Sequence, residues 1–161
     1  MKAIDLLMSQ HREVEDLFSK IEKAKSAGKK TELFEKLADD LAIHAAIEEH
    51  HFYPAVKDDG TEDILLESLE EHLGVKRLLA DLLDVSASDE TFDAKIKVLK
   101  EQIEHHVEEE EGELFPRAKQ LLNEDEMEAL GQAMSAEQAE LEEKGQPREN
   151  VLSETDAPAS I

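Results

Sequence analysis

The sequence predicts an all-α protein, namely an up-down-up-down four-helix bundle followed by a short fifth C-terminal helix. Three observations support this fold class. The chain of 161 residues has only 6 glycines and 4 prolines, and it is rich in Ala, Leu, Glu and Lys, which favour helices. Apolar residues recur at helical spacing in four long segments. The breaks between these segments are short, which makes neighbouring helices antiparallel.

Each of the four segments carries one apolar stripe that would face the core of the bundle. The stripes run from Ile4 to Ile21, from Leu33 to Phe52, from Leu65 to Leu82 and from Ile96 to Leu114. The expected breaks are Gly28-Lys29-Lys30, with Thr31 as the N-cap of the next helix, then Asp58–Thr61, and then Ser86–Ser88.

The fifth helix is expected to begin at Asn123, because Glu126 three residues later completes a capping box. It should run to about Lys144 and pack outside the bundle or against one end. Residues 145–161 contain few apolar side chains, so we expect a disordered tail. The predicted organisation is one domain, residues 1–144, and a tail, residues 145–161.

The charge balance excludes several classes of function. There are 41 acidic and 18 basic residues, a formal net charge of -23, and such a chain repels phosphate backbones. No apolar run is long enough to span a membrane, and the N-terminus lacks the apolar stretch of a signal peptide. There is no cysteine, hence no disulfide and no thiolate metal ligand. We therefore expect a cytoplasmic protein that binds neither nucleic acid nor membranes.

One histidine interrupts each apolar stripe, and two stripes also carry a glutamate four residues later, on the same helix face. These six residues are His11, His44, Glu48, His72, His106 and Glu110. A buried, unpaired carboxylate still costs several kcal/mol after relaxation, against a total stability of about 5–15 kcal/mol. A pair of metal ions held by four imidazoles and two carboxylates would neutralise both glutamates. Without a cation, the two carboxylates should raise each other's pKa.

An internal repeat fixes the register of these residues. The offsets between matching positions are 72 − 11 = 61, 106 − 44 = 62 and 110 − 48 = 62. A helical hairpin is therefore used twice. Each half would supply one metal ion with two histidines, and the two glutamates could bridge the ions. The repeat and the apolar phase both select His106 and Glu110 over the equally spaced pair His105 and Glu109.

These residues resemble the hemerythrin-like, or HHE cation-binding, domains over roughly residues 1–140. The resemblance rests on the six residues above and on the aromatic-Pro pair that follows each His-x-x-x-Glu motif. It implies a four-helix bundle around two non-haem iron ions joined by an oxo or hydroxo bridge. The roles it implies include the binding or sensing of O2, nitric-oxide handling, peroxide breakdown and metal storage or delivery.

The sequence departs from the family's respiratory oxygen carriers at two positions. The carriers have a second histidine one turn after the third-helix ligand, where this chain has Lys76, and their last ligand is an aspartate five residues after a histidine, where this chain has Glu110 after four. Lys76 could pair with a core carboxylate or extend to solvent. These departures favour the sensor and redox branch of the family over reversible oxygen carriage.

The leading function is therefore binding of, or reaction with, O2 or a related small oxidant (NO or H2O2), in sensing or in the response to oxidative or nitrosative stress. Iron storage or delivery, a peroxide-decomposing, catalase-like enzyme and a metal-free interaction module are the alternatives. Whether the protein is an enzyme, and which protein partner it has, stay open.

Other polar residues on the second helix and its repeat allow two roles each. His51 lies either near the metal ions or at the rim, and His50 is expected to be exposed. Tyr53, the only tyrosine, either packs at one end of the bundle or provides a redox-active phenol. Glu49 and Glu111 either bond the ligand histidines or face solvent.

Overall fold

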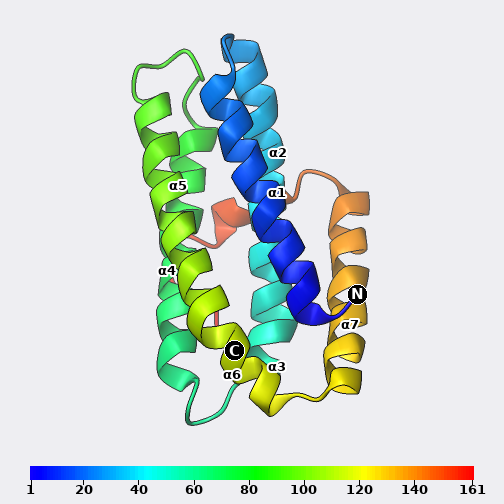
Figure 1. The fold of residues 1–161 in the computed structure, drawn as a ribbon. Helices are drawn as coiled ribbons and strands as arrows, with labels where there is room; N and C mark the ends of the chain where they lie inside the picture. The colour runs from blue at the N-terminus through cyan, green and yellow to red at the C-terminus, as the bar shows by residue number, and fades with distance from the viewer.

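The computed structural model describes all 161 residues and contains helices only. Four helical rods form an up-down-up-down bundle, as the sequence predicts (Figure 1). The first and third rods are single helices, α1 (Ala3–Lys23) and α4 (Glu62–Leu83). Each of the other two changes from an α-helix to a π-helix and back: α2 (Ala27–Ile47), η1 (Glu48–Phe52) and α3 (Tyr53–Ala55), then α5 (Phe92–Glu109), η2 (Glu110–Leu114) and α6 (Phe115–Leu121).

The fifth helix, α7 (Glu124–Lys144), begins with the capping box predicted between Asn123 and Glu126. It has 21 residues, as many as α1, and it packs outside the bundle against α1 and η1 (Figure 1). The N-terminus crosses α7 at Gly131, where a β-carbon would collide with the backbone carbonyl of Met1. This close approach requires glycine at that position.

The second helix begins earlier than the sequence suggests. Gly28 and the lysines after it were expected to form a loop ending at Thr31, but α2 begins at Ala27 and includes them. The N-cap is Ser26, whose hydroxyl accepts a hydrogen bond from the backbone N–H of Lys29. Because Gly28 lies in the exposed first turn, the cap outweighs its poor helix propensity.

The C-terminal segment differs from the expected disordered tail. Pro147–Ser153 forms a 3-10 helix, η3, that packs on α2 and α4. Its Val151 is only 2% exposed and joins the apolar core, while Arg148 pairs with Asp39 of α2 at 2.8 Å. One well-placed valine and one ion pair anchor a segment whose composition is otherwise polar.

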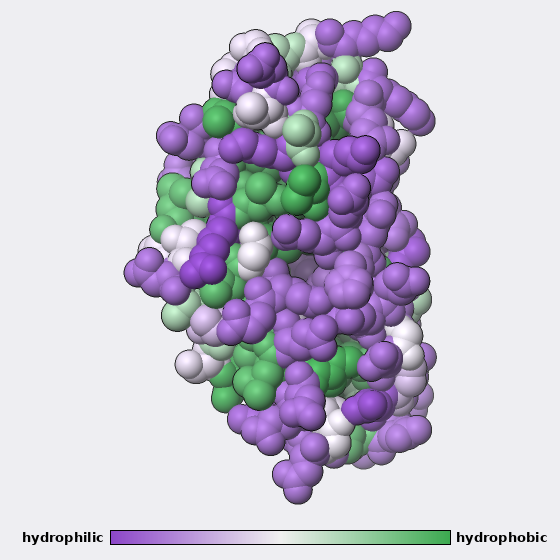
Figure 2. All heavy atoms as spheres, turned by 90° about the vertical axis from the view of Figure 1, so that its left-hand side faces the viewer, coloured by the Kyte–Doolittle hydropathy of each residue, from purple (hydrophilic) through white to green (hydrophobic).

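The interior contains two apolar cores, one toward each end of the bundle. The first core includes Phe18, Ile21, Phe34, Leu82 and Phe92, and the second includes Leu7, Phe52, Leu65, Phe115 and Met127. Between them lies a layer of buried polar side chains. On the outside, the face that includes α4 and α5 is mostly hydrophilic, with apolar side chains in bands between the charged ones (Figure 2). No helix has both the length and the apolar character needed to cross a membrane.

Candidate metal centre

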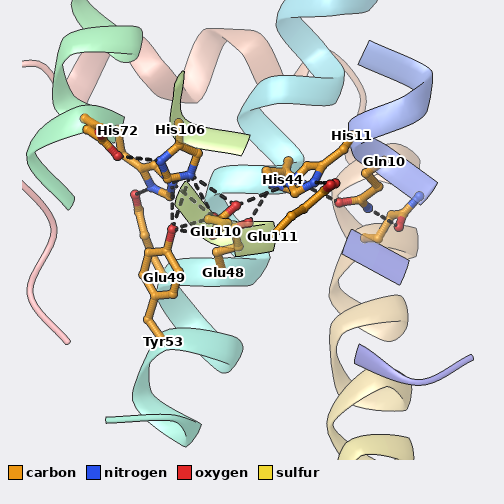
Figure 3. Close-up of polar contacts among 12 residues, drawn as sticks. Gln10, His11, His44, Glu48, Glu49, Tyr53, His72, His106, Glu110 and Glu111 are labelled. Atoms are coloured by element: carbon orange, nitrogen blue, oxygen red, sulfur yellow. Dashed lines mark hydrogen bonds and ion pairs between the residues drawn. The ribbon is translucent and has the colours of Figure 1, made fainter. Parts of the chain in front are cut away.

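The six residues singled out by the sequence meet in the polar layer between the two cores (Figure 3). α1, α4 and α5 each contribute one histidine, α2 contributes another, and the two glutamates are the first residues of η1 and η2. All six are at most 7% exposed. We call this set the His/Glu cluster: His11, His44, Glu48, His72, His106 and Glu110.

Glu48 lies between the two pairs of histidines. Its Oε1 is 2.6 Å from Nε2 of His44, and its Oε2 is 3.0 Å from Nε2 of His72. Figure 3 shows His11 with His44 on one side of the two glutamates and His72 with His106 on the other. The structure therefore groups the histidines by sequence half, as the repeat predicts.

Glu110 also contacts both histidine pairs. Its Oε1 lies 3.3 Å from Nε2 of His11 and 3.3 Å from Nε2 of His106. Two groups of the cluster have ligand atoms within 4.8 Å of one another: His11, His44, Glu48 and Glu110 form one group, and Glu48, His72 and His106 form the other. The carboxylate of Glu48, which belongs to both groups, places them next to each other.

Every histidine of the cluster is fixed through its Nδ1 atom, so that its Nε2 atom points inward. Nδ1 of His11 lies 2.9 Å from Glu111, and Nδ1 of His72 lies 2.7 Å from Glu49. The corresponding distances are 2.6 Å from His44 to Gln10 and 2.8 Å from His106 to Glu71. Such outer partners set the tautomer and orientation of metal-binding imidazoles.

These outer partners obey the internal repeat as well. Glu49 and Glu111 differ by 111 − 49 = 62 positions, and Gln10 and Glu71 by 71 − 10 = 61. Each of them supports a histidine on a different helix. The sequence left Glu49 and Glu111 open between this role and solvent, and it missed Gln10 and Glu71. Their signal was present, because each directly precedes a cluster histidine in its half.

Four polar atoms of the cluster are buried without a hydrogen-bond partner. They are Nε2 of His11, Nε2 of His44, Oε1 of Glu48 and Oε1 of Glu110. Nε2 of His44 and Oε1 of Glu48 are close, but their directions do not suit a hydrogen bond. Buried polar atoms are normally paired, and these four belong to one ligand group. Nitrogen and carboxylate donors converging in this way fit a divalent transition-metal ion.

The electrostatics of the metal-free cluster differ from the expectation of two mutually repelling carboxylates. Burial raises the pKa of the Glu48 carboxyl, but the neighbouring imidazoles lower it more, and the pKa lies well below its usual value. The pKa of Glu110 is also lowered, because its imidazole neighbours outweigh burial and the charge of Glu48. Conversely, the two glutamates raise the pKa of His106 well above 6.5 despite its burial. The difference arises because the imidazoles act as partners of the two glutamates even without a metal ion.

The Tyr53 side chain packs in the second apolar core, and its hydroxyl reaches the His/Glu cluster on the side of His72 and His106 (Figure 3). Its hydroxyl lies 2.8 Å from Oε2 of Glu48, 3.0 Å from Oε2 of Glu110 and 3.1 Å from Nε2 of His72. Burial and the two carboxylates raise the pKa of the phenol well above 10, so it stays protonated and donates to a carboxylate.

The two π-helices position both glutamates and the tyrosine. Each begins at a cluster glutamate, and each is followed by an aromatic residue and then Pro54 or Pro116. A proline in an α-helix clashes with the carbonyl four residues earlier, and the wider π turn relieves this clash. π-Helical turns frequently occur at functional sites.

The remaining histidines lie outside the cluster. The side chain of His105 is 60% exposed and sits near Glu71 and Glu109 on the outer face, while that of His106 is 5% exposed. His50 and His51 both contact Glu137 of α7, at 2.7 Å and 2.6 Å. The structure thus directs His51 toward α7, and His50 is exposed as expected.

Comparison with known proteins gives consistent matches. The family model described as hemerythrin HHE cation binding domain matches residues 2–118. A crystal structure of a hemerythrin HHE cation binding domain-containing protein from Mycobacterium kansasii superimposes with a TM-score of 0.80 over 89% of both chains, at 26% identity. A curated relative, a "DNA nickase" of Nostoc sp., is 26% identical over 144 residues, which are 89% of this chain but 41% of that protein.

Proposed function

This chain belongs to the hemerythrin HHE cation-binding domain family, and we propose that its His/Glu cluster binds two non-haem iron ions that react with O2 or a related small oxidant, NO or H2O2. The observation that supports this most strongly is the pair of ligand groups that share Glu48. Each group offers two imidazoles and at least one carboxylate, a donor set that suits non-haem iron with open positions. Two ferrous ions bound there would supply two electrons for the reduction of a small oxidant.

The protein's own residues prepare the site in three ways. Glu49, Glu71, Glu111 and Gln10 hold the four imidazoles with Nε2 facing the centre. Glu48 and Glu110 neutralise the positive charge of the metal ions. The apolar cores on both sides exclude bulk water, which strengthens every electrostatic interaction in the site.

Metal content tests the ligand assignment. Purified protein should contain close to two iron ions per chain, on the basis of its two ligand groups. The double variant Glu48→Ala/Glu110→Ala should lose most of the iron, because both removed carboxylates contact both histidine pairs. Glu108→Ala, on the exposed side of α5, is the matched control and should keep its iron. Full iron occupancy in the double variant would refute the bridging role of the glutamates.

Reactivity tests the functional assignment. The anaerobically reduced protein is mixed with O2, NO or H2O2, and its absorption spectrum is followed. A spectral change with at least one of the three is expected. Iron-loaded protein that responds to none of them would contradict this function.

Peroxide breakdown is a second candidate, and the position of Tyr53 favours it. The phenol hydroxyl lies within 3.5 Å of four atoms of the cluster, so it can donate a hydrogen bond to a peroxide oxygen in the site. In that reaction two H2O2 molecules yield two H2O and one O2, so peroxide is both oxidant and reductant. Sustained O2 release that Tyr53→Phe slows, with iron content unchanged, distinguishes this enzyme from a sensor that responds once.

Ferritin-like iron storage has less support. Its sequence signature would need His51 as a ligand after Glu48, but the His51 side chain contacts Glu137 of α7. A nucleic-acid substrate is suggested only by the name of the relative from Nostoc sp., of which this chain spans 41%. The net charge of -23 opposes binding to a phosphate backbone, so we infer a small-molecule ligand. A mobility-shift titration with duplex DNA checks this, and no complex is expected.

A further inference from the structure

A small cavity connects the His/Glu cluster with the C-terminal helix η3. It has a volume of about 30 Å³. Three cluster histidines line it together with apolar residues of the bundle and one residue of η3; the main lining residues are His44, His72, His106, Leu79, Ile103 and Val151. The cavity therefore lies between three histidines of the cluster and the C-terminal segment.

The chain reaches this position through a sharp reversal after α7. Gly145 has a φ of 77° and Gln146 a φ of 51°, both in the left-handed region. From there η3 runs across the bundle between α2 and α4, at the middle of its length (Figure 1). Gln146 is the one non-glycine residue with positive φ, a conformation that persists only where surrounding contacts hold it.

Ion pairs and hydrogen bonds hold η3 at both ends. At its start, Asp39 of α2 accepts hydrogen bonds from the backbone N–H of Arg148 at 3.0 Å and from its guanidinium at 2.8 Å. Beyond its end, Glu154 lies 3.3 Å from the ammonium group of Lys76 on α4. Between these two anchors, Val151 points into the cavity and is 2% exposed.

We propose that η3 covers the ligand passage to the His/Glu cluster, that Val151 controls entry, and that the passage admits small uncharged molecules rather than ions. The inference rests on the proposed function and narrows its ligand class. A cavity of about 30 Å³ matches the space of one small molecule. Its walls are largely apolar, and moving an ion into such surroundings is costly.

The one ammonium group on the wall does not change this conclusion. Lys76 lines the cavity, but Glu49 and Glu154 both pair with it, at 3.0 Å and 3.3 Å. Its charge is thereby neutralised by Glu49, which also holds His72, and by Glu154, which directly follows η3. An anionic ligand would have to compete with both carboxylates.

The first test measures the rate of NO binding to the reduced, iron-loaded protein by stopped-flow absorption. Val151→Phe should slow binding by at least about tenfold, which corresponds to about 1.4 kcal/mol in the barrier. Val151→Ala and Arg148→Ala should both speed it, the first by widening the passage and the second by releasing one anchor of η3. Leu152→Ala is the matched control, because this neighbour is 54% exposed and should leave the rate unchanged.

The second test needs no metal. Xenon, an apolar probe of dry cavities, should shift the NMR signals of the Leu79 and Ile103 methyl groups in the wild-type protein, and less so in Val151→Phe. Iron content and thermal unfolding of each variant are measured alongside. The proposal would be overturned if Val151→Phe bound NO at the wild-type rate and showed the same xenon-induced shifts as the wild-type protein. Wild-type protein that contains no iron would instead refute the proposed function. The xenon result would still decide whether the passage exists.

Discussion

The buried ion pair between Lys76 and Glu49 gives the sharpest stability prediction. The ammonium nitrogen of Lys76 lies 3.0 Å from Oε1 of Glu49, and the two side chains are 6% and 5% exposed. Lys76→Met keeps the length of the side chain and removes its charge. Glu49 would then remain buried with only His72 as a partner. Removing one member of such a pair costs about 3–5 kcal/mol, and we expect the lower end because His72 stays in place.

The assay is urea unfolding followed by circular dichroism, with a chelator present so that bound metal does not contribute. Glu49→Gln and the double variant complete a double-mutant cycle, which should give a coupling energy of about 1–3 kcal/mol. Lys100→Met is the control: its ammonium group also has a partner at 2.9 Å, Glu22, but the side chains are 33% and 53% exposed. That exposed pair should contribute at most about 1 kcal/mol. If the two methionine variants lose equal stability, Lys76 is not a buried ion-pair partner and the reasoning fails.

Three further predictions concern metal, pH and packing. Elemental analysis should show that His106→Ala loses iron while His105→Ala keeps it, since only the His106 side chain is in the cluster. Loss of iron in His105→Ala alone would mean that the repeat is misaligned by one residue. The metal-free protein should gain stability in denaturant unfolding as pH falls toward 6.5, because the folded-state pKa of His106 is raised above 6.5. It should lose stability below about 4.5, where the unfolded chain takes up protons while the lowered pKa values keep the cluster glutamates charged in the folded state. Metal-loaded protein should instead lose stability from about 6.5 downward as protons compete for the ligands, so parallel profiles of the two forms would refute metal binding at the cluster. Gly131→Ala should lower the unfolding free energy by about 1–3 kcal/mol through its collision with Met1, whereas Gly28→Ala, which meets no neighbour within 4 Å, should be neutral or stabilising.

The sequence predicted the helices well wherever local chemistry specifies them. The start of α7 was predicted within one residue, at Asn123 against Glu124, because Asn123 and Glu126 form their capping box without help from the rest of the chain. The start of α2 was missed because Gly28 was interpreted as a helix breaker, whereas Ser26 caps a helix that includes it. Helix propensity is a weak signal in the first, solvent-exposed turn, and the cap decides the boundary.

The six residues of the His/Glu cluster could be found because each interrupts an apolar stripe and because the repeat matches them in pairs. Their partners were harder to find. Gln10 and Glu71 lie beside the core-facing stripes, where polar residues are common and carry no signal of their own. Their role depends on which helix lies opposite. The position of η3 was beyond sequence reasoning, because a single valine has no periodicity. Tyr53 was also hard to place, because it directly follows the π-helix η1, which the sequence did not predict.

The paired π-helices occupy matching positions in the two halves of the internal repeat. η1 and η2 begin 110 − 48 = 62 residues apart, the same offset that relates the histidines of α2 and α5. A π-helical turn arises when one residue is inserted into an α-helix. Its occurrence at the same place in both halves is most simply explained by one insertion in an ancestral hairpin, before that hairpin was duplicated and fused. Two copies of such a hairpin would form a symmetric dimer with the metal pair on its axis. The difference between Gln10 and Glu71 would then be a later divergence that made the two halves of the site unequal.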